Sequence, residues 1–168
     1  MPPLAEIAPA AEEHLAAISA LAGLIWRAYY PTITSTEQIE YMLGWMYSLE
    51  TMTSEVRNGI RYERLLLDGE LAGFASLGPA DEPGTVKLHK LYLVPKYHGE
   101  GFGTLLLKHC ESEARKLDAR IMTLNVNKRN ARAIAVYQRN GFSIARSVVN
   151  DIGHGFVMDD YVMIKQLT

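Results

Sequence analysis

A glycine-rich segment between an apolar strand and a helix constrains this chain more than any other feature. Residues 91–94 have the composition of a strand, and residues 104–107 begin a helical pattern. Between them three glycines alternate: Gly99, Gly101 and Gly103. Glycines leave the backbone N–H groups uncovered, and a helix N-terminus adds unpaired donors and a partial positive charge. The segment therefore predicts a cradle for an anion, most often a phosphate.

The loop by itself is a weak signal, because a flexible turn before a helix would look the same. No Gly-Lys-Ser/Thr sequence closes it, so it differs from the phosphate loop of nucleotide triphosphatases. The Gly-x-Gly-x-Gly spacing also lies in the middle of the chain, where a dinucleotide fingerprint is not expected.

A second motif follows a strand that ends near Val126. It consists of an asparagine, an alanine, a tyrosine and a Gly-Phe pair at fixed spacing: Asn130, Ala133, Tyr137, Gly141 and Phe142. With this motif and the glycine loop together, the chain resembles the GNAT superfamily of N-acetyltransferases. The family pattern at the loop is Gln/Arg-x-x-Gly-x-Gly/Ala, and only its first position departs here, where His98 stands.

The resemblance implies that acetyl-CoA is the cosubstrate and that the loop holds its pyrophosphate. It also implies that the strand before the loop pairs with the pantetheine arm and donates an N–H to the acetyl carbonyl, and that Asn130 hydrogen-bonds the arm. Asn130 would serve equally as the N-cap of the following helix. The predicted cofactor-binding residues are Leu91, Tyr92, Leu93, His98, Gly99, Glu100, Gly101, Phe102, Gly103, Thr104, Asn130 and Tyr137.

Two residues are predicted to be catalytic, Tyr137 and His89. Tyr137 matches the family tyrosine near the cofactor sulfur, where a phenol can protonate the departing thiolate; the alternative is a packed helix aromatic.

Asn125 stands where some family members have a glutamate base. His89 lies at a position used as base or water relay in polyamine and serotonin acetyltransferases, and the alternative is a half-buried strand histidine. Alternation along the strand predicts that Lys87, His89, Leu91 and Leu93 share one face and that Lys90 lies on the other.

The order of elements predicts an α/β (α+β) fold, a sheet covered by helices. The resemblance implies the GNAT type of this fold: a mixed, mostly antiparallel central sheet, flanked by helices, in which the parallel strands at residues 85–94 and 120–126 splay apart. Helical patterns cover residues 10–29 and 35–46, with Ser35 as an N-cap. In the family this helix pair walls the acceptor pocket. Most aromatic residues of the pair are expected to pack in the core, and Tyr29 and Tyr30 are the ones predicted to face the substrate; the alternative is that they too are packing residues.

Length, charge and cysteine content indicate how many domains, which partners and which cell compartment to expect. The length of 168 residues suits one acetyltransferase domain over residues 1–168. A net charge of −2 gives no general attraction to nucleic acid, and no apolar run approaches the length of a membrane span. We therefore expect neither nucleic acid nor a membrane as a partner. The single cysteine, Cys110, has the helical spacing of a core residue, and with no secretory signal at the start we expect a cytoplasmic protein.

The predicted function is transfer of an acetyl group from acetyl-CoA to a primary amine of a small molecule, by direct attack in a ternary complex. A peptide or protein amine as acceptor, a different acyl donor and a non-catalytic acyl-CoA sensor are the alternatives. We expect no metal ion, and the sequence leaves a homodimer open. Four basic residues are candidates to neutralise the cofactor phosphates, although ordinary surface charges are the better interpretation of any one of them: Lys96, Lys128, Arg129 and Arg132. Three aspartates of the last hairpin are candidates to attract a cationic amine: Asp151, Asp159 and Asp160. For Asp159 and Asp160, a role in strand geometry or at a sheet edge is the better interpretation.

Overall fold

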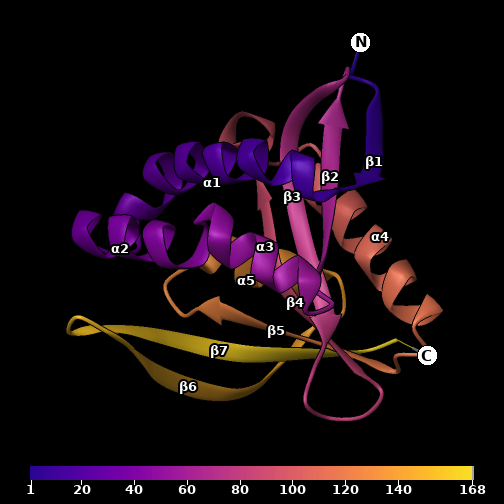
Figure 1. Cartoon of the computed structure of the whole chain (residues 1–168). Helices are drawn as coiled ribbons and strands as arrows, with labels where there is room; N and C mark the ends of the chain where they lie inside the picture. Colours follow the sequence, from indigo (N-terminus) through magenta and orange to yellow (C-terminus); the bar gives the residue numbers. More distant parts are fainter. Residues whose placement is uncertain (168) are drawn as a thin grey trace.

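The computed structural model describes residues 1–167, which form a seven-stranded sheet in the order β1-β2-β3-β4-β5-β7-β6 (Figure 1). All neighbouring strands are antiparallel except β4 and β5. The strands are β1 (Ala5–Pro9), β2 (Arg61–Leu67), β3 (Glu70–Pro79), β4 (Thr85–Leu93), β5 (Ile121–Asn127), β6 (Ser143–Gly153) and β7 (Phe156–Gln166). The predicted fold class is confirmed.

The parallel pair parts after four residue pairs. Thr85 to Leu88 of β4 lie opposite Ile121 to Leu124 of β5, and the two strands then diverge. The second half of β4 and the end of β5 therefore have no partner on their facing edges. This splay is the predicted one, and it opens the sheet beside the glycine loop.

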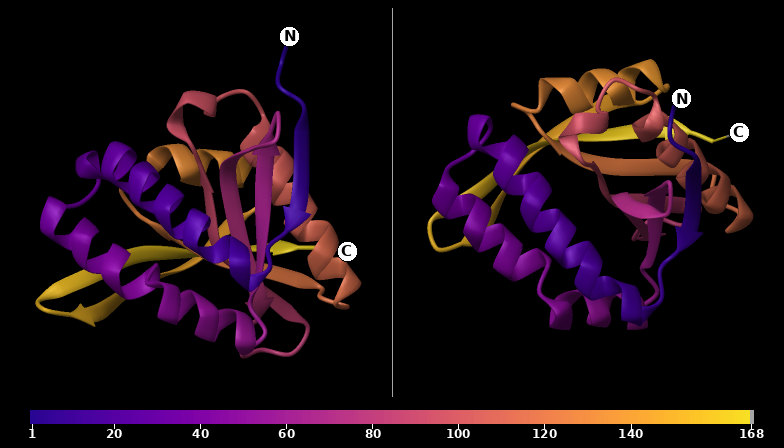
Figure 2. Two further views of the ribbon diagram at one scale, coloured as in Figure 1. Left: turned by 45° about the horizontal axis from the view of Figure 1, so that its top comes forward. Right: turned by 90° about the horizontal axis from the view of Figure 1, so that it is seen from above.

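Helices cover both faces of the sheet, as the two views of Figure 2 show. α1, α2 and α3 pack on one face around Phe74 and Tyr62, whereas α4 and α5 pack on the other around Leu106 and Leu107. The helices are α1 (Leu15–Tyr29), α2 (Thr36–Met46), α3 (Leu49–Arg57), α4 (Phe102–Lys116) and α5 (Ala131–Arg139), with short 3-10 turns η1 (Glu12–His14), η2 (Tyr30–Thr32) and η3 (Pro95–Tyr97). The sequence did not predict α3.

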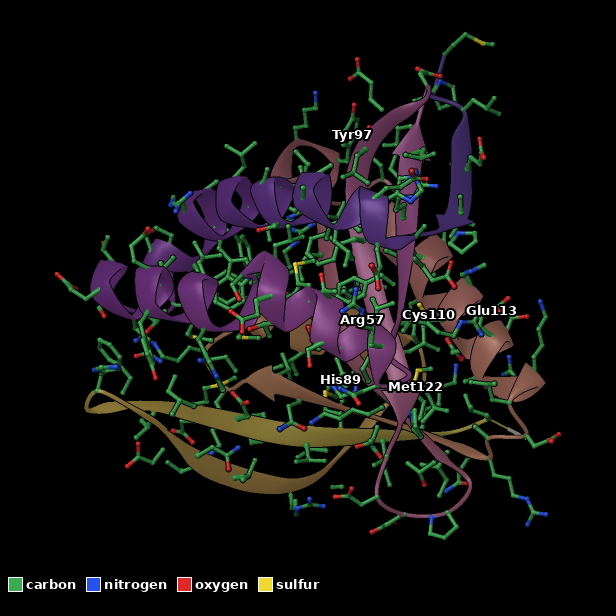
Figure 3. The ribbon with its side chains drawn as sticks, viewed as in Figure 1. Arg57, His89, Tyr97, Cys110, Glu113 and Met122 are labelled. Carbon is green, nitrogen blue, oxygen red and sulfur yellow. The ribbon has the colours of Figure 1, made fainter. Side chains whose placement is uncertain are left out.

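Several predicted local features are present. The Ser35 hydroxyl accepts a hydrogen bond from the Gln38 N–H at 3.2 Å and caps α2. Cys110 is fully buried in the α4 core (Figure 3), and burial raises the pKa of its thiol. No helix within residues 1–167 is long and apolar enough to cross a membrane.

A β-bulge in β4 changes which residues of the strand lie on each face of the sheet, compared with the prediction from the sequence. Ser76 of β3 lies opposite Lys90 and the next residue of β3 lies opposite Leu88, so His89 is the extra residue. One unpaired residue reverses the alternation that follows it. The expectation that His89, Leu91 and Leu93 continue one face was therefore wrong. Leu91 and Leu93 pack with α4, whereas Tyr92 packs with the α1–α3 layer.

Candidate active site

A cavity of about 390 Å³ opens where β4 and β5 part. It extends from the N-terminus of α4 to the face of β7, and helices α1, α2 and α5 contribute to its walls. Eleven predicted cofactor or catalytic residues line it: His89, Leu91, Tyr92, Leu93, His98, Gly99, Gly101, Gly103, Thr104, Asn130 and Tyr137. The predicted acceptor residues Tyr29 and Tyr30 line it as well.

Two predicted loop residues do not line the cavity. Glu100 is exposed, and the Phe102 ring packs edge-on against Tyr97 with 5.9 Å between ring centroids. Neither side chain therefore contributes to the cavity wall.

The glycine loop has free donors at the first turn of α4. Gly101 is the N-cap of this helix with φ of 89°, a left-handed conformation that glycine adopts without strain. Among the hydrogen bonds of residues 1–167, none is donated by the N–H groups of residues 102–104. A Cβ built on Gly103 meets no other atom within 4 Å, so the space above this turn is open. Free N–H groups, open space and the helix dipole suit a phosphate.

The loop also gathers positive charge. The Arg132 guanidinium lies 3.8 Å from a Cβ built on Gly99, and Arg132 and Arg139 both line the cavity. The other candidate cations have different contacts. Lys128 pairs with Asp159 at 2.7 Å, Arg129 donates to the Thr32 carbonyl at 3.5 Å, and Lys96 lies over the Tyr97 ring.

His98 fastens the loop to the end of β4. Its Nε2–H donates to the Leu93 carbonyl oxygen at 3.0 Å, since a carbonyl can only accept. Burial lowers the pKa of the His98 imidazole, which is consistent with a neutral ring. The Tyr29 ring packs edge-on against it at 5.5 Å. The residue that departs from the family pattern therefore holds the loop against the strand.

Tyr29, Tyr30 and Asn130 form one polar group at the cavity wall. Asn130 Oδ1 accepts from the Tyr29 hydroxyl at 2.8 Å and from the Ala133 N–H at 3.3 Å, so Asn130 is the N-cap of α5. Its amide nitrogen donates to the Tyr30 hydroxyl at 3.5 Å. The Tyr30 ring stacks on Trp26 with 4.2 Å between centroids.

Tyr137 is buried in α5 and packs edge-on against Phe142 at 5.7 Å. Burial raises the pKa of its phenol above the ordinary value of 10. The hydroxyl therefore keeps its proton at neutral pH, as a proton donor must.

His89 lies at the bulge, beside the splay, below α3 in the view of Figure 3. Its Nε2 atom is buried and has no hydrogen-bond partner among the described residues. Burial, followed by the charge of Lys87, lowers the pKa of the imidazole to about 4. The ring is neutral at pH 7 and can accept a hydrogen bond, but it is a weak base.

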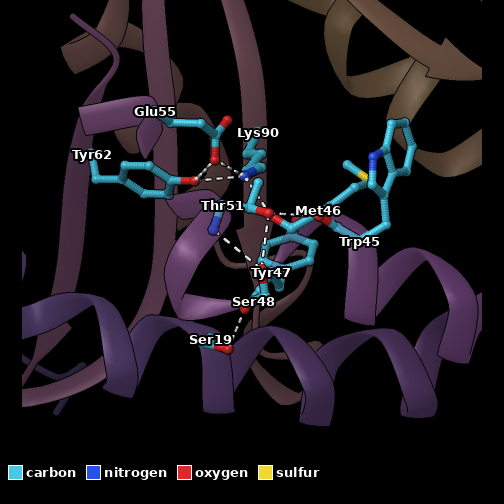
Figure 4. Close-up of polar contacts among 9 residues, drawn as sticks. All are labelled: Ser19, Trp45, Met46, Tyr47, Ser48, Thr51, Glu55, Tyr62 and Lys90. Atoms are coloured by element: carbon cyan, nitrogen blue, oxygen red, sulfur yellow. Dashed lines mark hydrogen bonds and ion pairs between the residues drawn. The ribbon is translucent and has the colours of Figure 1, made fainter. Parts of the chain in front are cut away.

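Lys90 belongs to a buried polar cluster that joins β4 to α3 (Figure 4). Its ammonium donates to Glu55 at 3.0 Å, and the Tyr62 hydroxyl donates to the same carboxylate oxygen at 2.9 Å. The ammonium also lies 4.6 Å from the centroid of the Tyr47 ring. Burial lowers the pKa of Lys90, while Glu55 opposes that shift. The buried amine of Lys90 is therefore paired within the chain, with Glu55 and the Tyr62 hydroxyl.

The three aspartates of the last hairpin are separated by the structure. Asp151 accepts from the Gly153 N–H at 2.8 Å, and Asp159 is exposed and paired with Lys128. Asp160 is 2% exposed and lines the cavity. Sequence reasoning named Asp160 only as one of three candidates for a cationic amine and did not distinguish it from the others, although strand alternation in β7 separates it from Asp159. It also missed other cavity residues: Gln38, Met42, Asn127, Arg139 and Met158.

The fold and the cavity together define a GNAT-type acetyltransferase architecture. A family model described as the acetyltransferase (GNAT) family matches residues 18–142. The chain belongs to this family, as the motifs around Gly101 and Tyr137 indicated.

Individual relatives agree with this assignment. An uncharacterised N-acetyltransferase of Mycobacterium tuberculosis is 36% identical over 100 residues, which are 60% of this chain and 63% of that protein. The match thus spans less than two thirds of that relative. A spermidine N(1)-acetyltransferase of Thermoplasma acidophilum is 29% identical over 92% of this chain and 95% of its own length.

A solved structure is similar over almost the whole chain. The PaiA N-acetyltransferase of Thermoplasma acidophilum, in complex with coenzyme A, superposes with a TM-score of 0.81 at 26% identity. The match covers 97% of this chain and 99% of that one.

Proposed function

We propose that this protein transfers the acetyl group of acetyl-CoA to a primary amine of a small molecule. The single observation that carries the proposal is one continuous cavity that joins the open first turn of α4 to the space beside β7. The similar PaiA structure contains coenzyme A, and the spermidine acetyltransferase shows that a relative uses a small amine.

The residues of the loop fit the cofactor. The N–H groups of residues 102–104 and the guanidinium of Arg132 would hold its phosphates, and His98 keeps the loop against β4. Beyond Leu88 the edge of β4 is free of β5, so its backbone groups would pair with the amides of the cofactor arm. Acetyl-CoA supplies the acetyl group as a reactive thioester.

Two side chains of the protein would carry out the proton transfers of the reaction. The buried phenol of Tyr137 retains its proton and would donate it to the departing thiolate. The neutral imidazole of His89 would accept a hydrogen bond from a water molecule and so relay a proton, rather than store one.

Contacts between α2 and the last hairpin favour a small acceptor over a peptide. An open groove at this place would suit a peptide, but α2 bridges it. Gln38 Nε2 donates to the Val157 carbonyl at 2.8 Å, and the Tyr41 hydroxyl donates to the Ile152 carbonyl. The Tyr41 ring also packs against His154 at 4.7 Å. We call these contacts the α2–hairpin clasp.

The test is a screen of polyamines, amino acids, arylalkylamines and peptide N-termini with release of free thiol as the readout. We expect turnover of at least one small amine and little turnover of peptides. Faster turnover of peptides would replace the small-molecule acceptor with a peptide. Tight binding of acetyl-CoA without turnover of any amine would instead favour an acyl-CoA sensor.

A further inference from the structure

Asp160 is a buried carboxylate on the acceptor side of the cavity. In β7 it lies opposite Asn127 of β5, so the two side chains share one face of the sheet. Both line the cavity, together with the apolar side chains of Met42 and Met158. A carboxylate among such neighbours is costly unless a cation meets it.

No cation of the described chain meets it directly. The ion pairs and side-chain hydrogen bonds of residues 1–167 include none to the Asp160 carboxylate. The adjacent Asp159 shows the contrast, because it points to solvent and pairs with Lys128 at 2.7 Å.

The charged groups that act on Asp160 are few. Asp159 on its own strand disfavours the ionised form, whereas Lys87 from β4 and Lys128 from the loop after β5 favour it. The facing residues of α2, Gln38 and Met42, carry no charge, and His89 across the cavity is neutral. Burial outweighs the two lysines and raises the pKa of the carboxyl to about 6.

We propose that Asp160 is the acceptor-binding residue, which holds the ammonium group of a cationic amine inside the cavity and takes its proton. This inference rests on the proposed acetyltransferase function and adds a specificity to it: the acceptor enters as an organic cation. An ammonium group supplies the charge partner that the chain does not provide, and its apolar part lies against Met42 and Met158.

The proton balance follows from this position. The bound ammonium first gives one proton to the Asp160 carboxylate, which passes it to solvent. The free amine then forms its bond to the acetyl carbon, the carbon–sulfur bond breaks, and the nitrogen gives its second proton to Asp160 while the thiolate takes the proton of Tyr137. Asp160 releases this second proton to solvent and Tyr137 regains one, so that the net products are the amide, the thiol and one proton.

The experiment uses Asp160→Asn with Asp159→Asn as the matched control. Phenethylamine and 2-phenylethanol are the probes, because they differ only in that the alcohol has a hydroxyl group where phenethylamine has its amine. Their binding to the protein with saturating coenzyme A is measured by calorimetric titration at pH 8. We expect the parent and Asp159→Asn to bind the amine at least about tenfold more tightly than the alcohol, and Asp160→Asn to bind both equally.

Activity gives a second, separate readout. With phenethylamine as acceptor, kcat/KM of the parent should rise with pH around pH 6, and Asp160→Asn should lack this rise. Binding of acetyl-CoA should be the same in all three proteins, which also shows that the variants are folded.

The outcomes separate this inference from the proposed function. If amines are turned over but Asp160→Asn behaves like Asp159→Asn, the acceptor role of Asp160 is wrong and the acetyltransferase function stands. The acceptor role of Asp160 is also overturned if the parent protein binds phenethylamine no more tightly than 2-phenylethanol. If no amine is turned over but the preference for the cation depends on Asp160, the binding site stands and the proposed reaction is wrong.

Discussion

The Tyr29 hydroxyl donates to Asn130 Oδ1 at 2.8 Å, although the two residues are 101 positions apart in the chain. The same oxygen caps α5 by accepting from the Ala133 N–H. One amide thus joins the end of α1 to the start of α5 across the mouth of the splay, so the acceptor-side helix and the motif helix are positioned together.

Asn130→Ala should therefore cost stability chiefly through two lost contacts, because the third, from its amide nitrogen to the Tyr30 hydroxyl, is long at 3.5 Å. The N-cap is worth about 1 kcal/mol, and loss of the Tyr29 contact adds about 1 kcal/mol. For a chain of this length the melting temperature should fall by about 4–8 °C, which thermal unfolding monitored by circular dichroism measures. Tyr29→Phe removes only the second contact and should cost about half as much. Equal costs for the two variants would mean that the cap contributes nothing.

Gly103→Val should weaken acetyl-CoA binding without loss of stability. A Cβ at Gly103 meets no protein atom within 4 Å, so the new side chain fills the space above the first turn of α4. Gly101 is a poorer choice because its φ of 89° would strain any other residue. The control is Gly44→Val in α2, which also meets no atom within 4 Å and does not line the cavity.

Calorimetric titration with acetyl-CoA distinguishes the two valine variants. We expect at least about a tenfold higher Kd for Gly103→Val and an unchanged Kd for Gly44→Val. Parent-like affinity in Gly103→Val would show that the phosphates do not approach this turn.

Tyr137→Phe should lower kcat by about tenfold to a thousandfold while the Kd of acetyl-CoA stays nearly constant. The change removes the proton and keeps the ring that packs against Phe142. Tyr97→Phe, at a tyrosine outside the cavity, is the control and should be neutral. Steady-state thiol release checks this, and unaltered turnover when chemistry is rate-limiting would reduce Tyr137 to a packing residue.

His89→Gln should lower kcat by about tenfold or less, by the same factor at every pH between 6 and 9. The pKa of the imidazole is lowered to about 4, so the ring is already neutral over this whole range and its charge does not change. A pH–rate profile measures the factor. A defect that shrinks steadily as pH rises would instead identify His89 as the general base.

The glycine loop and the Asn130 cap were predictable because each follows from a short motif whose chemistry is local. The splayed strand pair was expected only because these motifs make the chain resemble the GNAT family. The β-bulge at His89 was not predictable, since strand alternation continues through it and only pairing with β3 reveals the extra residue. Helix α3 was missed because it is short and only Met52 among its residues is fully buried.

The acceptor side of the site was less predictable than the cofactor side. Asp159 and Asp160 are adjacent and identical in type, and only the register of β7 against β5 decides which one enters the cavity. The clasp likewise depends on contacts between residues more than 100 positions apart, such as Gln38 with Val157. No local pattern encodes such pairs.

Asp160→Asn should stabilise the protein at neutral pH even as it impairs acceptor binding. Burial raises the pKa of the carboxyl from the ordinary 3.8 to about 6, so the fold favours the protonated form. Ionised Asp160 therefore destabilises the native state by up to about 3 kcal/mol above pH 6, and the penalty disappears as pH falls below about 4. The uncharged amide removes it. We expect a melting temperature about 2–8 °C above that of the parent at pH 7.5 and the same as the parent at pH 4, with a much smaller change for the exposed Asp159→Asn. A difference that is the same at both pH values would show that the gain comes from packing and not from the buried charge.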